Sequence, residues 1–255
     1  MDLKLAGKTA VITGGARGIG LSMARALAAE GVNVALLDLL EGVGDTAAEI
    51  STEFGVQTCG LRLDVTDQDA TEACFATVRE QLGVPQVLLT AAGIEINEDS
   101  IDVSAADWRK VIDVNLAGTF FSCQAFGRGL LDAELPGSAV LVASMSGVIV
   151  NVPQWAASYN SSKAAVAHLA RSLAVEWAAA GIRVNSMSPG YVLTDLTRQI
   201  LERQPELEAE WVALIPQGRM ATPEDLAGLV LFLASDISSY LTGQQIVIDG
   251  GYTAV

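Results

Sequence analysis

The sequence predicts an α/β fold, with one doubly wound parallel sheet of seven strands and helices on both faces. Short apolar runs alternate with longer segments of helical periodicity along the chain. Such alternation requires crossover connections, which make the strands parallel and place helices over both faces of the sheet. Of the 255 residues, 51% are hydrophobic and only 5% are aromatic, so the core must be largely aliphatic. That composition suits strands that are buried on both faces.

Each element is predicted from its own pattern, in chain order. Apolar runs predict strands at residues 9–13, 33–38, 57–63, 86–90, 138–144, 182–187 and 245–248. Helical periodicity predicts helices at residues 18–30, 44–54, 67–82, 105–131, 157–180 and 223–233. The polar, amphipathic region at about 191–215 is expected to form a mobile substrate lid. No repeat or linker interrupts the pattern, so residues 1–255 are expected to form a single domain.

Charge and cysteine content exclude several classes of function. The chain has 15 basic and 30 acidic residues, a net charge of −15, which disfavours nucleic acid and anionic membranes as partners. No apolar run reaches the ~20 residues of a membrane span, and no signal peptide is expected. Cys59, Cys74 and Cys123 lie far apart, without metal-ligand spacing. We therefore expect buried, reduced thiols, no metal site and a cytoplasmic location.

A glycine-rich turn follows the first predicted strand. The stretch GGARGIG at 14–20 leads into a helix, and glycines there let the backbone approach a pyrophosphate bound at the helix N-terminus. The predicted dinucleotide contacts in this turn are Gly14, Arg17, Gly18, Ile19 and Gly20. Asp38 ends the second strand, where a carboxylate binds the adenosine ribose and repels a 2′-phosphate. Arg17 could instead hold such a phosphate, but Leu39 stands where an arginine would help it, so NAD is the predicted cofactor.

The stretch YNSSK places Tyr159 and Lys163 four residues apart. On a helix these two side chains share one face. A free tyrosine has a pKa of ~10, and a nearby ammonium and the positive nicotinamide ring of the predicted cofactor both favour the phenolate and so lower that pKa. The spacing also occurs in purely structural helices, so the pair alone does not establish chemistry.

Taken together, GGARGIG, Asp38 and YNSSK resemble the short-chain dehydrogenase/reductase family over almost the whole chain. The resemblance implies a Rossmann fold that transfers hydride between NAD(H) and a secondary alcohol or ketone. It implies four catalytic residues: Asn115, which bends its helix, Ser144, which holds the substrate oxygen, Tyr159 as base, and Lys163, which also binds the nicotinamide ribose. Further implied cofactor contacts are Asp64, Val65, Ala91, Ala92, Gly93, Pro189, Gly190, Val192 and Thr194. Thr90 stands where the family usually has asparagine, which could alter the bracing of the sheet.

Two assignments leave alternatives. Ser146 lies two residues after Ser144 and could be the catalytic serine instead, although alignment with the family's pattern favours Ser144. The single histidine, His168, follows Lys163 by five residues and so lies on a different helix face. A packing or interface role for His168 is favoured over catalysis.

The segment SMSGVIVNVPQ and the end GGYT resemble the sugar-alcohol branch of the family. A polyol needs several hydrogen-bond partners, because an unpaired polar group in a buried pocket is unfavourable. Ser146, Asn151, Gln154, Trp155 and Tyr191 are the predicted substrate residues, although ordinary loop polarity also explains each of them. The alternatives are a broad carbonyl reductase, a 3-oxoacyl reductase, and a non-catalytic nucleotide-binding regulator. Relatives also imply a homotetramer formed through the helices at 105–131 and 157–180.

Overall fold

Seven parallel strands form one sheet in the computed structural model, which describes residues 2–194, 197–198, 201–202 and 204–255. The strands are β1 Thr9–Thr13, β2 Asn33–Asp38, β3 Thr58–Arg62, β4 Val87–Thr90, β5 Gly137–Val142, β6 Ile182–Pro189 and β7 Gln245–Ile248. Their order across the sheet is β3-β2-β1-β4-β5-β6-β7, and every neighbouring pair is parallel. The predicted strands are confirmed, with ends that differ by one or two residues.

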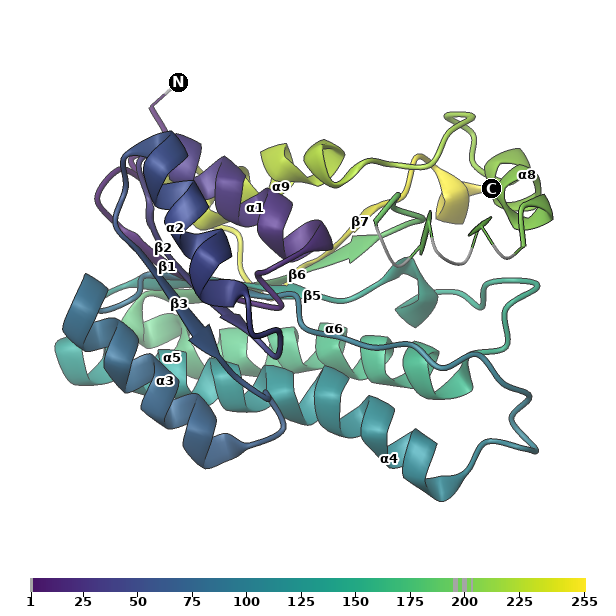
Figure 1. Cartoon of the computed structure of the whole chain (residues 1–255), viewed down its shortest axis with the longest axis horizontal. Coiled ribbons are helices and arrows are strands. Elements are labelled where there is room, and N and C mark those ends of the chain that lie inside the picture. The colour runs from purple at the N-terminus through teal and green to yellow at the C-terminus, as the bar shows by residue number, and fades with distance from the viewer. Residues whose placement is uncertain (1, 195–196, 199–200, 203) are drawn as a thin grey trace.

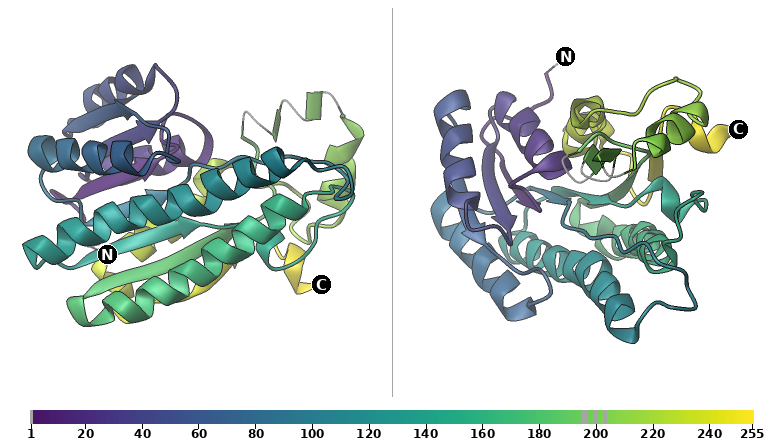
Figure 2. Two further views of the ribbon diagram at one scale, coloured as in Figure 1. Left: turned by 90° about the horizontal axis from the view of Figure 1, so that it is seen from below. Right: turned by 45° about the vertical axis from the view of Figure 1, so that its right-hand side comes forward.

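Helices cover both faces of this sheet (Figures 1 and 2). One face carries α1 Gly18–Ala29, α2 Val43–Phe54 and α9 Ala227–Ala234, and the other carries α3 Gln68–Leu82, α5 Gly118–Ala133 and α6 Ala157–Trp177. α4 Ala105–Ile112 leads into α5, and α8 Glu206–Ala213 lies near the C-terminus. The predicted three-layer α/β architecture is confirmed.

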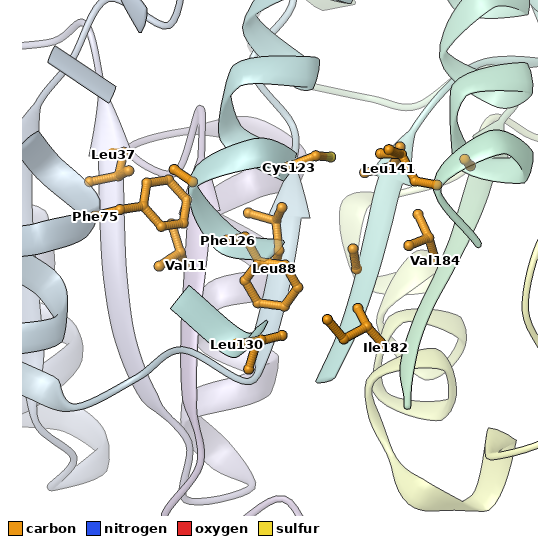
Figure 3. Close-up of a cluster of buried hydrophobic side chains, with 14 of the residues drawn as sticks. Val11, Leu37, Phe75, Leu88, Cys123, Phe126, Leu130, Leu141, Ile182 and Val184 are labelled. Atoms are coloured by element: carbon orange, nitrogen blue, oxygen red, sulfur yellow. The ribbon is translucent and has the colours of Figure 1, made fainter. Parts of the chain in front are cut away.

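Alternation along each strand divides the core into two layers, because successive side chains of a strand point to opposite faces. Val11, Leu88 and Leu141 pack with Phe75 and Phe126 on the α3–α5–α6 side (Figure 3). The residues between them face α1, α2 and α9. The central strands are thus buried on both faces, which explains their almost uninterrupted apolar sequence.

Three predicted helices differ from a regular α-helix. The segment at 157–180 ends in a 3₁₀ turn, Ala178–Ala180, after α6. The segment at 105–131 contains a π-helical turn, Asp113–Ala117, between α4 and α5. This turn includes Asn115, the residue expected to bend the helix. The segment at 223–233 begins with a 3₁₀ turn, Pro223–Leu226, before α9. Pro223 starts this turn, and Thr222 and Asp225 form a capping box around it.

The predicted lid at 191–215 is described only in part. Residues 195–196, 199–200 and 203 lie outside the described residues, and its mobility stays a prediction. The C-terminal half of the region is packed: Leu207 and Trp211 of α8 are buried in a cluster with Met145, Ile215 and Tyr252.

The order of the strands determines where a ligand site can lie. The chain leaves β1 toward β2 on one side, and β4 lies on the other, so a crevice opens at the carboxyl ends of β1 and β4. The two turns at this crevice nearly touch. A Cβ added to Gly14 would lie 2.7 Å from the Ala92 backbone nitrogen, and Gly14 has a φ of +65°. Glycine is therefore required at this position.

Candidate active site

A cleft of about 1150 Å³ opens at the carboxyl ends of the strands. Every residue predicted to contact the cofactor or the substrate lines it, together with Ser144. Asn115 does not line the cleft, because it is fully buried behind the wall. The tertiary structure therefore brings the predicted residues into one site, although they come from segments distributed along the chain.

The nucleotide end of the cleft is formed by the glycine turn and by Asp38. α1 begins at Gly18, and among the described residues no side chain caps its first amides, which leaves them available to an anion. The two carboxylate oxygens of Asp38 accept hydrogen bonds from the backbone nitrogens of Ala16 (3.0 Å) and Leu40 (3.1 Å). A Cβ on Gly20 would collide with the Gly14 carbonyl oxygen. This donor set, with one fixed carboxylate beside it, fits a dinucleotide.

Tyr159 and Lys163 lie on the first turns of α6. The Lys163 Nζ is 5.6 Å from the centre of the Tyr159 ring and donates a 2.8 Å hydrogen bond to the Val142 carbonyl oxygen. Lys163 is only 5% exposed. Burial lowers its pKa to about 8, and the negative charge of Glu95 opposes that lowering.

The pKa of Tyr159 differs from the expectation. Part of this side chain faces the open cleft, but dense surrounding protein raises its pKa, and the charge of Glu95 raises it further. Only a hydrogen bond with Ser144 lowers it. The protein's own groups therefore do not lower this pKa, because removing a phenolate from water outweighs the hydrogen bond of Ser144. The expected contribution of the nicotinamide ring stays a prediction.

The hydroxyl of Ser144 is the serine hydroxyl that contacts Tyr159. Ser144 Oγ donates to Ser146 Oγ and accepts from the Ser146 backbone nitrogen, both at 3.1 Å. The segment after β5 lies directly on α6, because a Cβ on Gly147 would be 2.6 Å from the Ala164 backbone nitrogen. This contact holds the segment that carries both serines against the helix of Tyr159.

Asn115 connects two walls of the cleft. Its Oδ1 accepts from the Ile94 backbone nitrogen (2.8 Å), and its Nδ2 donates to the Ile94 carbonyl oxygen (2.9 Å) and to Ser162 Oγ (3.0 Å). The segment after β4 is thereby held against α6. A Cβ on Gly93 would lie 3.3 Å from Asn115 Oδ1 and 3.4 Å from Lys163 Nζ, so this backbone packs directly on the catalytic side chains.

Three of the five predicted substrate residues, Asn151, Gln154 and Tyr191, form a hydrogen-bonded wall. Asn151 Nδ2 donates to the Tyr191 hydroxyl (3.2 Å), which donates to Gln154 Oε1 (3.0 Å). The Tyr191 ring stacks on Trp211 with centroids 4.4 Å apart. Trp155 is half exposed and also lines the cleft. A polar wall with an aromatic backing suits a ligand that carries hydroxyl groups.

The sequence interpretation missed several residues that line the cleft. They are Glu95, Asn97 and Glu98 after β4, Arg109 and Lys110 of α4, and Trp211 of α8. A signal existed for the first three, because they follow Gly93 closely and the carboxyl ends of parallel strands meet at the same edge. The others come from helices whose orientation depends on packing.

No catalytic role is expected for the three cysteines or the single histidine. Cys59, Cys74 and Cys123 are free thiols, but Cys74 is half-buried, so the expectation of three buried thiols is wrong for it. His168 is exposed on α6.

Among the described residues, no cluster of three or more His, Cys, Asp or Glu side chains could hold a metal ion. No helix described by the structure is both long enough and apolar enough to cross a membrane.

Comparison with known proteins places this site in a family. The family model described as "Enoyl-(Acyl carrier protein) reductase" matches residues 14–253. A short-chain type dehydrogenase/reductase from Mycobacterium marinum has a solved structure with a TM-score of 0.94 and 40% identity, covering 100% of this chain and 98% of that one. The chain belongs to the short-chain dehydrogenase/reductase family.

Curated members of this family align with almost the whole chain. D-arabinitol 2-dehydrogenase [ribulose-forming] of Candida tropicalis is 41% identical, over 98% of this chain and 94% of that protein. Galactitol 2-dehydrogenase (L-tagatose-forming) of Cereibacter sphaeroides is 43% identical, over 98% and 96%. The NADP-dependent mannitol dehydrogenase of Hypocrea jecorina is 41% identical, over 99% and 95%. The resemblance to the sugar-alcohol branch is confirmed.

Proposed function

We propose that this short-chain dehydrogenase/reductase oxidises a sugar alcohol to its ketose, and catalyses the reverse reaction, with NAD(H). The observation that carries the proposal is the meeting of Ser144, Tyr159 and Lys163 at one end of a cleft whose other end is the glycine turn. The names of the arabinitol, galactitol and mannitol dehydrogenases support the substrate class.

Each polar group has a defined task in this reaction. A nicotinamide dinucleotide held by the glycine turn and Asp38 would supply the hydride-transfer chemistry. Tyr159 removes the hydroxyl proton of the substrate as its alcohol is oxidised, and returns it during ketone reduction. The Ser144 hydroxyl donates to the substrate oxygen as negative charge develops there. Lys163, whose side chain lines the cleft beside Tyr159, would hold the nicotinamide ribose. Asn115 holds the segment after β4 in place and positions Lys163 indirectly.

Asp38 supports NAD as the cofactor. Its carboxylate is held at the end of β2 by the Ala16 and Leu40 amides, where it would repel a 2′-phosphate. Arg17 lines the same end of the cleft and is exposed, which favours the competing proposal of NADP. Because the mannitol dehydrogenase is named as NADP-dependent, NADP is included beside NAD in the test.

We further propose a cytoplasmic homotetramer without nucleic acid or membrane partners. The three free thiols are consistent with a reducing compartment. Apolar side chains on the outer faces of α5 and α6 support subunit contacts: Phe120, Leu131 and Val175 are 38%, 47% and 83% exposed.

The proposal is tested by initial rates with NAD and with NADP, followed by cofactor absorbance. The substrates are galactitol, arabinitol, xylitol, sorbitol, mannitol, vicinal diols and a hydroxyacyl thioester. Polyol oxidation with NAD is the expected result. Activity with NADP alone would mean that Arg17 outweighs Asp38. Activity on the thioester alone would indicate an acyl reductase, and NAD binding without any turnover would indicate a regulator.

A further inference from the structure

The cleft contains a carboxylate that the catalytic assignment does not use. Glu95 lies two residues after Gly93 in the segment that follows β4, and its side chain is open to water inside the cleft. A carboxylate beside the reacting groups is unexpected, because negative charge there opposes formation of the Tyr159 phenolate. A function in substrate binding would offset this unfavourable effect of the carboxylate on the phenolate.

Hydrogen bonds before and after Glu95 in the sequence hold the backbone of its segment in place. On one side, Asn115 binds the backbone nitrogen and the carbonyl oxygen of Ile94, at 2.8 and 2.9 Å. On the other side, the Glu98 backbone nitrogen donates to the Trp155 carbonyl oxygen at 2.8 Å. The segment that carries Glu95 therefore spans from the catalytic residues to the substrate wall, and Asn97 contacts its carboxylate.

Glu95 lines the same cleft as Tyr159 and Lys163, beside which the substrate would react. It interacts electrostatically with Lys163 and with Tyr159, both on α6. Arg109 and Lys110 of α4 line the same cleft and are exposed, as Glu95 is, so solvent screens all three charges. An acceptor beside a neutral substrate hydroxyl forms a charge-assisted hydrogen bond, whereas the same group repels an anion.

We propose that Glu95 is a specificity residue, which accepts a hydrogen bond from a substrate hydroxyl near the reacting carbon and excludes substrates with a carboxylate there. This inference rests on the proposed function and deepens it. The site would accept neutral polyols and reject the sugar acids of the same chain length. Carboxylate oxygens bind two hydroxyls well, which fits a substrate with neighbouring hydroxyl groups.

Binding to the enzyme–NADH complex tests this inference without any turnover. NADH fluorescence is titrated with galactitol and galactonate, and with arabinitol and arabinonate. Wild type, Glu95→Gln and Glu98→Gln are compared. Glu98 also lines the cleft, so the second variant removes one negative charge at a neighbouring position. The affinity for NADH and the thermal midpoint establish that each variant is folded.

The expected result is that wild type binds each polyol at least about tenfold more tightly than the matching sugar acid. Glu95→Gln should reduce that ratio by about tenfold, while Glu98→Gln leaves it within about twofold. An unchanged ratio in Glu95→Gln, an equal shift in Glu98→Gln, or no binding of either ligand class would overturn the inference. Oxidation of the polyols by wild type is scored separately, so polyol binding without turnover would count against the proposed function alone.

Discussion

Single side chains in this site differ from free amino acids chiefly because of burial. Lys163 is almost inaccessible to solvent, and burial lowers its pKa to about 8. The same environment raises the pKa of Tyr159. Both shifts disfavour the charged forms that the proposed chemistry needs. A positively charged nicotinamide would therefore have a larger effect on the phenol than it would in water, because charges interact more strongly in a low dielectric.

The contact between Ser144 and Tyr159 predicts unequal roles for the two serines. Ser144→Ala should lower kcat for polyol oxidation by at least about a hundredfold, because it removes the donor to the substrate oxygen. Ser146→Ala should lower kcat by less than about tenfold, and Tyr159→Phe should abolish turnover. Steady-state rates measure these effects, and NADH binding should remain near wild type in all three. A larger loss for Ser146→Ala would reverse the assignment of the serines.

The charge of Glu95 predicts a change in the pH profile. Alcohol oxidation requires the Tyr159 phenolate, so its rate rises as pH rises through the pKa of that group. Glu95 raises this pKa, and Glu95→Gln should therefore shift the rise of kcat/KM to lower pH.

The alkaline side of the same profile should move in the same direction, because Glu95 also raises the pKa of Lys163. Arg109 and Lys110 contribute positive charge from α4 in both proteins, so they do not account for a difference. Glu98→Gln serves as the control. A profile that moved to higher pH in Glu95→Gln would contradict the prediction.

At the scale of elements, a π-helical turn and a buried threonine at a strand end are the features that depart from regular secondary structure and full hydrogen bonding. The π-helical turn between α4 and α5 places Asn115 so that its amide reaches Ile94 and Ser162. π-turns of this kind occur frequently at functional sites. At the end of β4, Thr90 replaces the family's usual asparagine, and in the described structure its buried hydroxyl has no hydrogen-bond partner.

The unpartnered hydroxyl of Thr90 predicts that a substitution can stabilise the sheet. Thr90→Val keeps the shape of the side chain and removes a buried polar group, so the free energy of unfolding should rise by roughly 1 kcal/mol. Thr9→Val is the matched control, since the Thr9 hydroxyl donates a 2.6 Å hydrogen bond to the Leu82 carbonyl oxygen. That variant should lower the free energy of unfolding. Denaturant unfolding measures both, and a loss in Thr90→Val would show that its hydroxyl is bonded in solution.

At the scale of the whole molecule, the outer faces of α5 and α6 bear directly on assembly. Val175 on α6 is 83% exposed, and Phe120 and Leu131 add apolar surface on α5. These are the helices that we propose form the tetramer contacts. Size-exclusion chromatography with light scattering should therefore give four times the mass of the chain.

A charge on the proposed interface should separate the subunits. Val175→Glu would bury a carboxylate without a partner, so light scattering should give a smaller species. Ile101→Glu changes a side chain that is 92% exposed and lies before α4, and it should leave the mass unchanged. A wild-type protein that is monomeric in solution would contradict the tetramer proposal.

Local pattern by itself determined most of the fold and the main groups of the site. The central strands are buried on both faces, so their apolar runs mark them without reference to any partner. Glycines at 14–20, Asp38, Tyr159 and Lys163 were identified from spacing, because the backbone turn and the helical period impose that spacing. Resemblance to the family added Asn115 and Ser144.

Only the tertiary structure decided how these groups affect one another. The raised pKa of Tyr159, the contact of Ser144 rather than Ser146, and the position of Glu95 all depend on neighbours far away in the chain. Burial of Trp211 against Tyr191 depends on how α8 packs. Desolvation and charge interactions follow from distances in space, and local periodicity carries no information about them.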